Sequence, residues 1–472
     1  MNAVAGRMRV CVLLVLFFRA ASASDGATAV PQIGSAEKAI HEEMTAQHIP
    51  GMAVAIIDKG KVVLARGYGL ANVEHDVPVT PETVFQSGSV GKQFTAAAIL
   101  SLVEDGRLSL DDSIAKYLPE APASWSPIRI HHLLTHTSGI PDYATDGFDL
   151  RGDYDDAKLV RLASQLPLEF AAGSRWNYSN TGYALLGIII DRITGQHYSE
   201  LLRQRIFGPL GMKSARLIDE ASIVRHRAAG YRLQNGALAN QEWVSPTLNT
   251  TADGSLYLSL NDMIAWDAGL RSGRVLRAES WRKIYTPVVL SSGNSYPYGF
   301  GWDVSVSRGQ EIHEHGGAWQ GFKTYIRRYM GDDITVIVLA NLGDADPRHL
   351  TDRIAGATYP KLAEPVPGAI ADTAPHLAAA LQHFLTVAAS GSLTSADLPH
   401  LNGGVTPDVA ASYRRQLAAL GQVKSISLVR RHPLGDDTAS DYRVRFESGE
   451  RLVNQIADPD GKHVSVALTA SE

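Results

Sequence analysis

Strand-forming segments stand at both ends of a long helical region, and this arrangement limits the possible folds more than any other feature of the sequence. Residues 52–58 and 62–68 are apolar, β-branched runs, and their connection at residues 59–61 is typical of a hairpin. Helical and loop patterns dominate from about residue 108 to 290. Strand patterns return at residues 311–315, 322–328 and 334–339. We therefore expect an α+β fold in which both ends of one domain complete an antiparallel sheet flanked by helices.

A proline-containing stretch separates this first domain, residues 24–363, from the rest of the chain. Residues 364–375 hold three prolines and are predicted to form a linker. Two helical and four strand-like runs follow, at residues 376–389, 407–420, 423–429, 441–446, 451–456 and 463–468. Residues 376–472 are therefore predicted to form a small α+β domain of unknown role. Its candidate roles are binding a protein partner, forming a dimer, or covering the first domain as a lid.

The first 23 residues have the layout of a secretory signal. Arg7 and Arg9 precede the apolar run 10–18, and residues 21–23 offer a small-residue cleavage site. The nine apolar residues of this run are too few to span a bilayer. We expect residues 1–23 to be a signal peptide and the mature protein to be periplasmic or secreted, with no stable membrane span after cleavage. An uncleaved anchor is the alternative.

Cysteine usage and charge narrow the chemistry and the partners. The only cysteine, Cys11, lies inside the predicted signal, so the mature chain is expected to have no disulfide, no thiol nucleophile and no cysteine-bound metal. Removing the signal leaves 41 basic and 49 acidic residues, a formal charge of −8. A mildly acidic chain without basic runs argues against nucleic acid as a partner.

Ser89 and Lys92 are the residues where we expect the chemistry. They lie in a small-residue turn that leads into a predicted helix through residues 96–103, one face of which is expected to be buried. Ser89 lies at the helix start, and Lys92 lies about one turn further along the same face. A serine hydroxyl needs a neighbouring base to act as a nucleophile, and the Ser-x-x-Lys pattern supplies both groups. Taken alone, the pattern also fits a capping serine followed by a solvated lysine.

A polar loop before the apolar helical run 184–193 offers two further groups. The Tyr178 phenol is suited to relay a proton, and the Asn180 amide is suited to hold a substrate carbonyl. The structural alternative is a loop that caps the helix through Asn180 or Thr181.

The glycine-rich segment 315–317 stands at the predicted end of a strand. Glycines there allow a substrate backbone to approach closely, and free N–H groups at a strand edge can stabilise an oxyanion. A glycine-containing turn between two strands is the alternative. His136, in the segment 133–141, has no chemical role that its residues suggest, and we expect it to hold a loop.

In this order along the chain, the motifs resemble those of the penicillin-recognising serine hydrolases, and most closely the class C β-lactamases, D-Ala-D-Ala carboxypeptidases and esterases. The resemblance covers about residues 33–361 and includes the segments 133–141, 208–212 and 298–302. It implies a serine β-lactamase-like fold for residues 24–363. It also implies an enzyme that forms an acyl-enzyme with a small-molecule or peptide substrate and needs no metal or other cofactor.

The same resemblance implies a role for each site residue. Ser89 is the acylated nucleophile, and Lys92 helps to remove its proton. Tyr178 acts as the base and returns the proton to the leaving group, while Asn180 binds the acyl-side amide of the substrate. The backbone N–H groups of Ser89 and Ala318 form the oxyanion hole.

The third motif departs from the commonest family pattern. His315 and Gly317, which with Ala318 form the predicted substrate-binding strand, stand where many β-lactamases and peptidases have Lys-Thr-Gly. Lysine is a permanent cation for a substrate carboxylate, whereas a histidine of ordinary pKa, about 6.5, is mostly neutral at pH 7. We therefore expect esters first, then D-amino-acid peptides or amides, then β-lactams.

A neutral His315 also affects the proton transfers. No cation at residue 315 then helps to lower the pKa of Lys92, which leaves desolvation and the helix end to lower it. We therefore expect Tyr178, hydrogen-bonded to Lys92 and His315, to carry more of the proton transfer.

Two other classes of protein are alternatives. A penicillin-binding-like sensor or scaffold, which does not turn substrate over, needs the same fold. A zinc hydrolase built on His131-His132 or on His313 and His315 is disfavoured, because acidic or histidine partners at ligand spacing are missing nearby.

Overall fold

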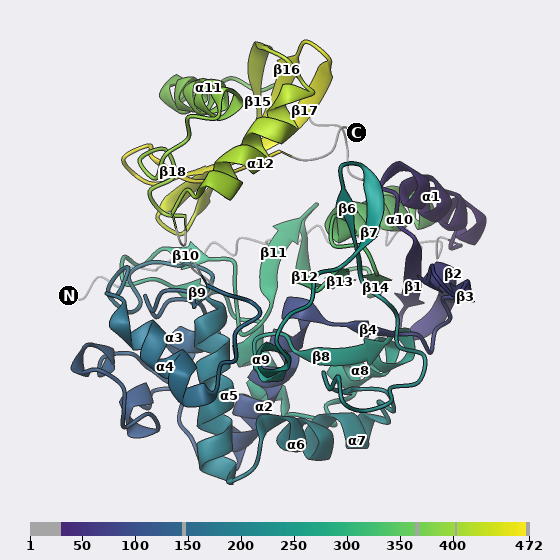
Figure 1. Ribbon diagram of the computed structural model, residues 1–472, viewed down its shortest axis with the longest axis vertical. Helices are drawn as coiled ribbons and strands as arrows, with labels where there is room; N and C mark the ends of the chain where they lie inside the picture. Colours follow the sequence, from purple (N-terminus) through teal and green to yellow (C-terminus); the bar gives the residue numbers. More distant parts are fainter. Residues whose placement is uncertain (1–29, 144–147, 364–367, 402–403, 469–472) are drawn as a thin grey trace, which may run out of the picture.

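The computed structural model describes residues 30–143, 148–363, 368–401 and 404–468. The predicted signal peptide, with Cys11, and residues 364–367 of the predicted linker lie outside these ranges. Figure 1 shows a large body of helices and strands, with a smaller unit made of late residues beside it. Within the described ranges, no helix combines the length and the apolar character needed to cross a membrane.

A seven-stranded antiparallel sheet forms the centre of the large body. In order across the sheet its strands are β11 (Asp303–Ser307), β12 (Gln310–Trp319), β13 (Phe322–Tyr329), β14 (Ile334–Ala340), β1 (Gly51–Asp58), β2 (Lys61–Asn72) and β3 (Val77–Pro78). Because β1 pairs with both β2 and β14, the two ends of the domain meet in one sheet, which confirms the predicted α+β fold. The β1–β2 turn has left-handed backbone at Lys59 and Gly60, as a two-residue hairpin turn requires.

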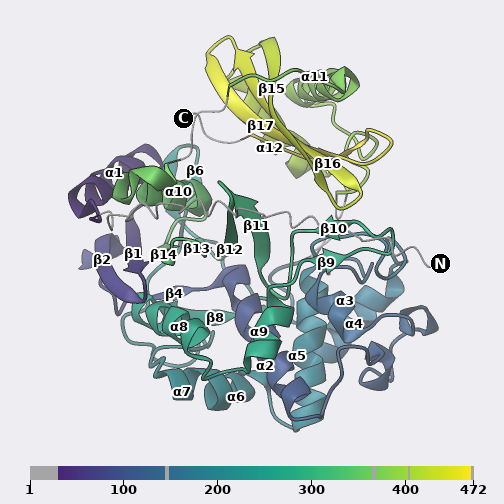
Figure 2. The ribbon, with the colours of Figure 1, turned by 180° about the vertical axis from the view of Figure 1, so that it is seen from behind.

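Both faces of the sheet are buried. Successive strand residues point to opposite faces, and the even-numbered residues of β1 belong to the core under α1 (Ile33–Ala46) and α10 (Pro347–Thr358). The odd-numbered ones belong to the core that includes α2 (Lys92–Glu104) and α8 (Leu260–Ser272). Figure 2, the view from behind, shows α1 and α10 together beside the strands β1, β13 and β14. This two-sided burial explains why β1 is apolar throughout.

The region between the two halves of the sheet is mostly helical, as predicted. It contains α3 (Ile130–Leu134), α4 (Asp156–Gln165), α5 (Asn180–Thr194), α6 (Tyr198–Leu202), α7 (Gly208–Leu210) and α9 (Ala278–Ile284). Short strands accompany them, namely β4 (Val84–Gln86), β5 (Arg216–Leu217), β6 (Tyr231–Gln234), β7 (Ala237–Asn240), β8 (Leu256–Ser259), β9 (Val288–Val289) and β10 (Ser295–Tyr296).

The helix that follows Ser89 is buried on every side. All residues of α2 from Lys92 to Leu102 are buried, so burial extends beyond the one face that the sequence predicted. The reason is the position of α2, which contacts α5, α6 and α9 and belongs to the same core as one face of the sheet. A helix that is covered all round need not be amphipathic.

The smaller unit has its own sheet and core. Its four antiparallel strands are β15 (Val423–Leu434), β16 (Asp437–Phe446), β17 (Gly449–Ala457) and β18 (His463–Leu468), and its helices are α11 (Pro375–Ser390) and α12 (Pro407–Ala418). Side chains such as Phe384 and Tyr442 form a core of this unit alone. The last residue of the predicted linker, Pro375, is the first residue of α11.

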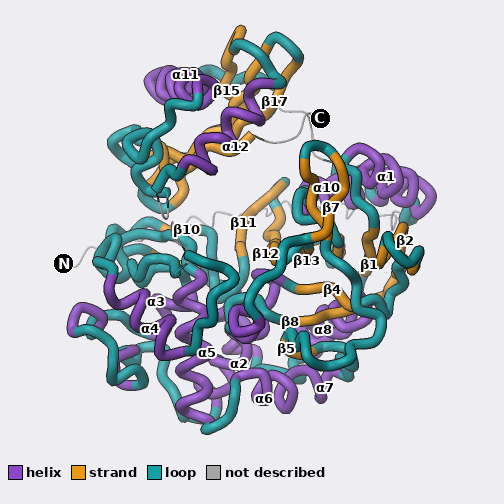
Figure 3. The backbone as a smooth tube through the Cα atoms, in the orientation of Figure 1, coloured by secondary structure: helices purple, strands orange, loops and turns teal. Residues whose placement is uncertain are grey.

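The β15–β16 hairpin is longer than the sequence suggested and reaches the large body. It turns at Gly435-Asp436, where Gly435 has left-handed backbone, and its tip lies beside β10 (Figure 3). The Gly435 N–H donates to the Ser295 carbonyl. Asp437 forms an ion pair with Arg175 at 3.2 Å. Arg175 precedes the loop that carries Tyr178, so the smaller unit contacts the large body close to that loop.

Candidate active site

Ser89 lies in a 3₁₀ turn, Gly88–Gly91, that leads directly into α2. Gly88 has left-handed backbone, and a Cβ atom there would collide with the backbone nitrogen of Ala318. A Cβ atom on Gly317 would collide with the Ser87 carbonyl and lie 3.0 Å from the Ser89 nitrogen. The glycines therefore allow the nucleophile turn to pack against β12, which brings the backbone of Ser89 beside that of Ala318.

The segment 315–317 lies inside β12 and not at a strand end or in a turn. Strand β11 pairs with β12 only as far as the Asp303–Glu314 pair, so from His315 onward this edge of β12 is left to the Ser89 turn. The Thr324 hydroxyl of β13 donates to the Ser87 carbonyl at 2.6 Å and ties the turn to the sheet.

The Lys92 amine is the centre of the site. It lies 3.1 Å from Ser89 Oγ and donates to Asn180 Oδ1 at 2.8 Å and to the Asp253 carbonyl at 2.6 Å. Burial lowers the pKa of Lys92 to about 8, although the charges of Asp253 and Asp142 act in the opposite direction. Because of desolvation, this amine holds its proton less tightly than an exposed lysine does, as the sequence led us to expect.

Tyr178 reaches the same point from the loop before α5. Its ring lies under the Lys92 amine, with 4.9 Å from Nζ to the ring centroid. Burial raises the pKa of the Tyr178 phenol well above its ordinary value, and a hydrogen bond with Ser89 acts in the opposite direction. The structure thus brings together the three predicted catalytic side chains, Ser89, Lys92 and Tyr178.

Helix α5 begins at Asn180, and its cap is Ser179, not Asn180 or Thr181 as considered above. Ser179 has extended backbone, and its hydroxyl accepts from the Gly182 N–H. This leaves the Asn180 side chain to accept from Lys92. The Asn180 N–H donates to the Asp142 carboxylate at 2.8 Å, which fixes the start of the helix.

A chain of hydrogen bonds runs behind these residues from α5 to β12. The Ser179 N–H donates to His136 Nδ1 at 3.1 Å, and His136 Nε2 lies 3.1 Å from the Tyr298 hydroxyl. That hydroxyl lies 2.9 Å from His315 Nε2, and His315 Nδ1 lies 2.6 Å from the Gly316 carbonyl.

The two ends of the chain fix the direction of every bond in it. A backbone N–H only donates, so His136 Nδ1 accepts and its Nε2 carries the proton. A carbonyl only accepts, so His315 Nδ1 carries the proton and its Nε2 accepts from Tyr298. Burial lowers the pKa of His136 well below its usual value and that of His315 to about 4, and the charge of Lys92 lowers both further. Both rings are therefore neutral at pH 7.

This chain overturns one expectation and explains two motifs. The predicted Tyr178–His315 hydrogen bond was wrong, because both ring nitrogens of His315 bond elsewhere. His136 does hold a loop, but its side chain is also linked through the Tyr298 hydroxyl to His315. The segment 298–302 supplies Tyr298, and its glycine at 301 lets this segment pack against the start of α2, since a Cβ there would lie 2.8 Å from the Lys92 carbonyl.

Sequence reasoning missed Tyr298 and the carbonyl of Asp253. A backbone carbonyl leaves no sign in the residue type. Tyr298 carried a signal only as part of a family-like segment, because its partner His136 is 162 residues away in the chain.

The fold and the site together define a class of protein, the penicillin-recognising serine hydrolases. Residues 36–359, more than half of the chain, match the sequence model of the Beta-lactamase family, and the chain belongs to that family.

Two curated relatives illustrate the family. A D-aminopeptidase of Gluconobacter oxydans is 32% identical over 302 residues, which are 62% of this chain and 56% of that protein. Penicillin-binding protein 4* of Bacillus subtilis is 28% identical over 323 residues, 64% of this chain and 70% of that one. The chain thus spans little more than half of the D-aminopeptidase. These relatives support the predicted enzyme class, a serine hydrolase.

Solved structures agree with the fold. The octameric penicillin-binding protein homologue from Pyrococcus abyssi has a TM-score of 0.61 and 27% identity over 90% of each chain. The D-amino acid amidase from Ochrobactrum anthropi SV3 has a TM-score of 0.62 and 23% identity over 70% of this chain and 99% of that chain, which shows a shared fold alone.

Proposed function

We propose that this chain is an exported serine hydrolase that forms an acyl-enzyme at Ser89 with esters and amides, including amides and peptides of D-amino acids. We further propose that it does not need a carboxylate on its substrate. The observation that carries the proposal is the state of His315, whose two ring nitrogens both bond to the protein.

Charge and free hydrogen-bond donors decide whether the site can bind a substrate carboxylate. A carboxylate is bound well by a cation or by free hydrogen-bond donors. His315 is neutral because its pKa is lowered to about 4, and its one N–H is taken by the Gly316 carbonyl. This disfavours β-lactams and peptides recognised by a terminal carboxylate. The names of the D-aminopeptidase relatives support D-amino-acid substrates that present an amino end.

In the acylation step, Lys92 takes the proton from Ser89 as Oγ attacks the substrate carbonyl carbon. The lowered pKa of Lys92, about 8, leaves part of the amine neutral near pH 7 and able to accept that proton. The N–H groups of Ser89 and Ala318 stabilise the oxyanion of the tetrahedral intermediate. One such donor contributes on the order of 10²–10³ in rate.

Tyr178 is better suited to give a proton than to take one. The raised pKa keeps the phenol protonated at rest, so it donates to the leaving group and is reprotonated from Lys92. This assigns the first proton transfer to Lys92, whereas the sequence alone led us to favour Tyr178. Water then hydrolyses the ester at Ser89 and frees the enzyme.

Export rests on the layout of residues 1–23. Expression of the full chain in a bacterium with two membranes should place the activity in the periplasmic fraction, with a mature amino terminus near residue 24. Activity confined to the cytoplasmic fraction would contradict the export.

A side-by-side turnover screen tests the function. The substrates are a short-chain p-nitrophenyl ester, a D-phenylalanine amide, a D-Ala-D-Ala peptide and a chromogenic cephalosporin, and Ser89→Ala is the control. We expect turnover of the ester and the D-amide that Ser89→Ala abolishes. Turnover of only the two carboxylate-bearing substrates would overturn the proposal. A stable adduct with a fluorophosphonate and no turnover of any substrate would indicate a sensor instead.

A further inference from the structure

We propose that Tyr298, held by His136, is a specificity-determining positioning residue that keeps His315 Nε2 as a hydrogen-bond acceptor and so excludes substrate carboxylates. This inference rests on the proposed function above. Tyr298 does not touch the reacting atoms in this account and acts through His315.

The two ends of the chain are backbone groups that cannot reverse. The Ser179 N–H is fixed at the start of α5, and the Gly316 carbonyl is fixed in β12. If His315 moved its proton to Nε2, Nδ1 would face the Gly316 carbonyl without a proton. If Tyr298 then donated back to His136, the proton of His136 would move to Nδ1 and face the Ser179 N–H. Each reversal thus leaves two buried groups unbonded, which folded proteins avoid.

Packing prevents the rings from turning away. His136, Tyr298 and His315 are all buried, at 1%, 1% and 4% exposure. The His136 ring lies 4.8 Å from that of Tyr298 and 4.2 Å from that of Tyr178, centroid to centroid. The chain is therefore part of the wall against which Tyr178 packs.

The groups around the chain also disfavour a cation at residue 315. The positive charge of Lys92 lowers the pKa of both His136 and His315. The Tyr183 hydroxyl contacts Tyr298, but it donates its own proton to the Leu134 carbonyl at 2.8 Å, so it has none to give to the chain. The Glu314 carboxylate favours a protonated His315, but it forms an ion pair with Arg327.

Tyr298→Phe removes the hydroxyl that holds His315 Nε2 and leaves a ring of nearly the same shape. The Nε2 atom of His315 then has no donor from the protein, so it can take a proton and donate it to a substrate carboxylate. Tyr183→Phe is the matched control, because it deletes the buried phenol oxygen that contacts Tyr298 outside the chain and leaves the His136–Tyr298 and Tyr298–His315 bonds in place.

The kinetic test compares two substrates that differ only in the carboxylate, D-Phe-D-Ala and D-Phe-D-Ala amide. We expect the wild type and Tyr183→Phe to prefer the amide, and the kcat/KM ratio of amide to acid to fall about tenfold in Tyr298→Phe, the effect of one charge-assisted hydrogen bond. An equal loss on both substrates in Tyr298→Phe would overturn the proposal. Titration with a fluorophosphonate corrects each rate for the fraction of active sites.

A spectroscopic readout is independent of turnover. Nitrogen-15 NMR of histidine-labelled protein distinguishes a protonated from an unprotonated ring nitrogen. We expect one fixed tautomer for His136 and His315 in the wild type and in Tyr183→Phe, and a changed or mixed His315 signal in Tyr298→Phe. An unchanged His315 signal would overturn the proposal. If neither substrate were turned over, the proposed function would fail, while this readout would still decide the role of Tyr298.

His136→Asn serves if Tyr298→Phe does not fold. Residue 136 has left-handed backbone, which asparagine tolerates, and the amide oxygen can still accept from the Ser179 N–H. The variant lacks the donor to Tyr298, so we expect the amide-to-acid ratio to fall in the same direction by a smaller factor. An unchanged ratio together with an unchanged His315 signal would count against the chain.

Discussion

The Lys92 amine lies 3.1 Å from the Ser89 hydroxyl in a position closed to solvent. The pair comes from one turn of chain, yet its surroundings come from distant segments, since the amine also bonds to Asn180 and to the Asp253 carbonyl. The burial that these segments impose lowers the pKa of the amine and makes it a usable base.

Lys92→Arg tests the amine as a base. Arginine keeps the positive charge but stays protonated at any working pH, so it cannot accept the Ser89 proton. We expect the rate of acylation to fall by about 10²–10⁴. Stopped-flow kinetics with a p-nitrophenyl ester measures it, and circular dichroism controls for the fold. A loss of less than threefold would rule out Lys92 as the base.

The pH dependence should report the same group. Because the active form of Lys92 is neutral and its pKa is lowered to about 8, log kcat/KM should rise with pH and level off above about pH 8. His315, with a pKa lowered to about 4, should add no inflection between pH 5 and 8. A profile that is flat from pH 6 to 9 would contradict the assignment.

Gly88→Ala tests the close approach of the nucleophile turn to β12. The added methyl group meets the backbone nitrogen of Ala318, so the turn must move and the oxyanion hole with it. We expect kcat to fall at least about 10²-fold, the effect of one lost oxyanion donor. Gly106→Ala is the matched control, since its backbone is also left-handed but nothing lies within 4 Å of the added atom. Equal activity of the two variants would argue against the geometry.

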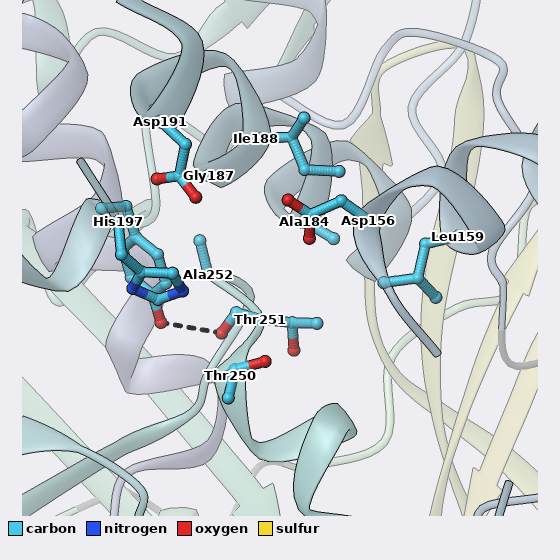
Figure 4. A pocket seen from close by; sticks show the side chains of 11 residues that line it. Asp156, Leu159, Ala184, Gly187, Ile188, Asp191, His197, Thr250, Thr251 and Ala252 are labelled. Carbon is cyan, nitrogen blue, oxygen red and sulfur yellow. Dashed lines mark hydrogen bonds between the residues drawn. The ribbon is translucent and has the colours of Figure 1, made fainter. Parts of the chain in front are cut away.

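Asp191 lines a small cavity between α5 and the segment 250–252 (Figure 4). Burial, and then the charge of Asp156, raises the pKa of Asp191 to about 7. The folded protein therefore binds this proton more tightly than the unfolded chain does, where the pKa is about 3.9. The stability it contributes is fully present below pH ~3.9 and is lost as the pH rises through about 7.

Asp191→Asn should accordingly have a higher Tm than the wild type at pH 8, with the difference shrinking toward pH 5. Asp156→Asn removes the second cause alone and should give a smaller gain. Thermal melts at the two pH values measure both. A lower Tm of Asp191→Asn at pH 8 would show that the carboxylate stabilises the fold.

The sheet could be predicted because its strands carry local signals. The apolar runs around residues 59–61 and the late strand runs fixed which segments pair, and the observed sheet joins them as expected. The continuation of β12 through residues 316 and 317 could not be predicted, since glycines read as a turn. Their role depends on the Ser87–Ser89 backbone, which is more than 200 residues earlier in the chain.

The features of the site also divide into those that the sequence predicts and those that it does not. Ser89, Lys92, Tyr178 and Asn180 stand in short recognisable motifs, and the structure brings them together. The hydrogen-bonding of His315 could not be predicted, because it depends on Tyr298 and His136, and these two residues share no local pattern with His315. The direction of the Lys92 pKa shift could be predicted, since an amine at the start of a helix that packs into the core loses solvation.

The most direct test of the central claim is peptide mass spectrometry of enzyme quenched during turnover of a D-amino-acid ester. The account predicts an acyl group on the peptide that contains Ser89, which is absent in Ser89→Ala and forms more slowly in Tyr178→Phe. An acyl group on another residue, or undiminished turnover by Ser89→Ala, would contradict it.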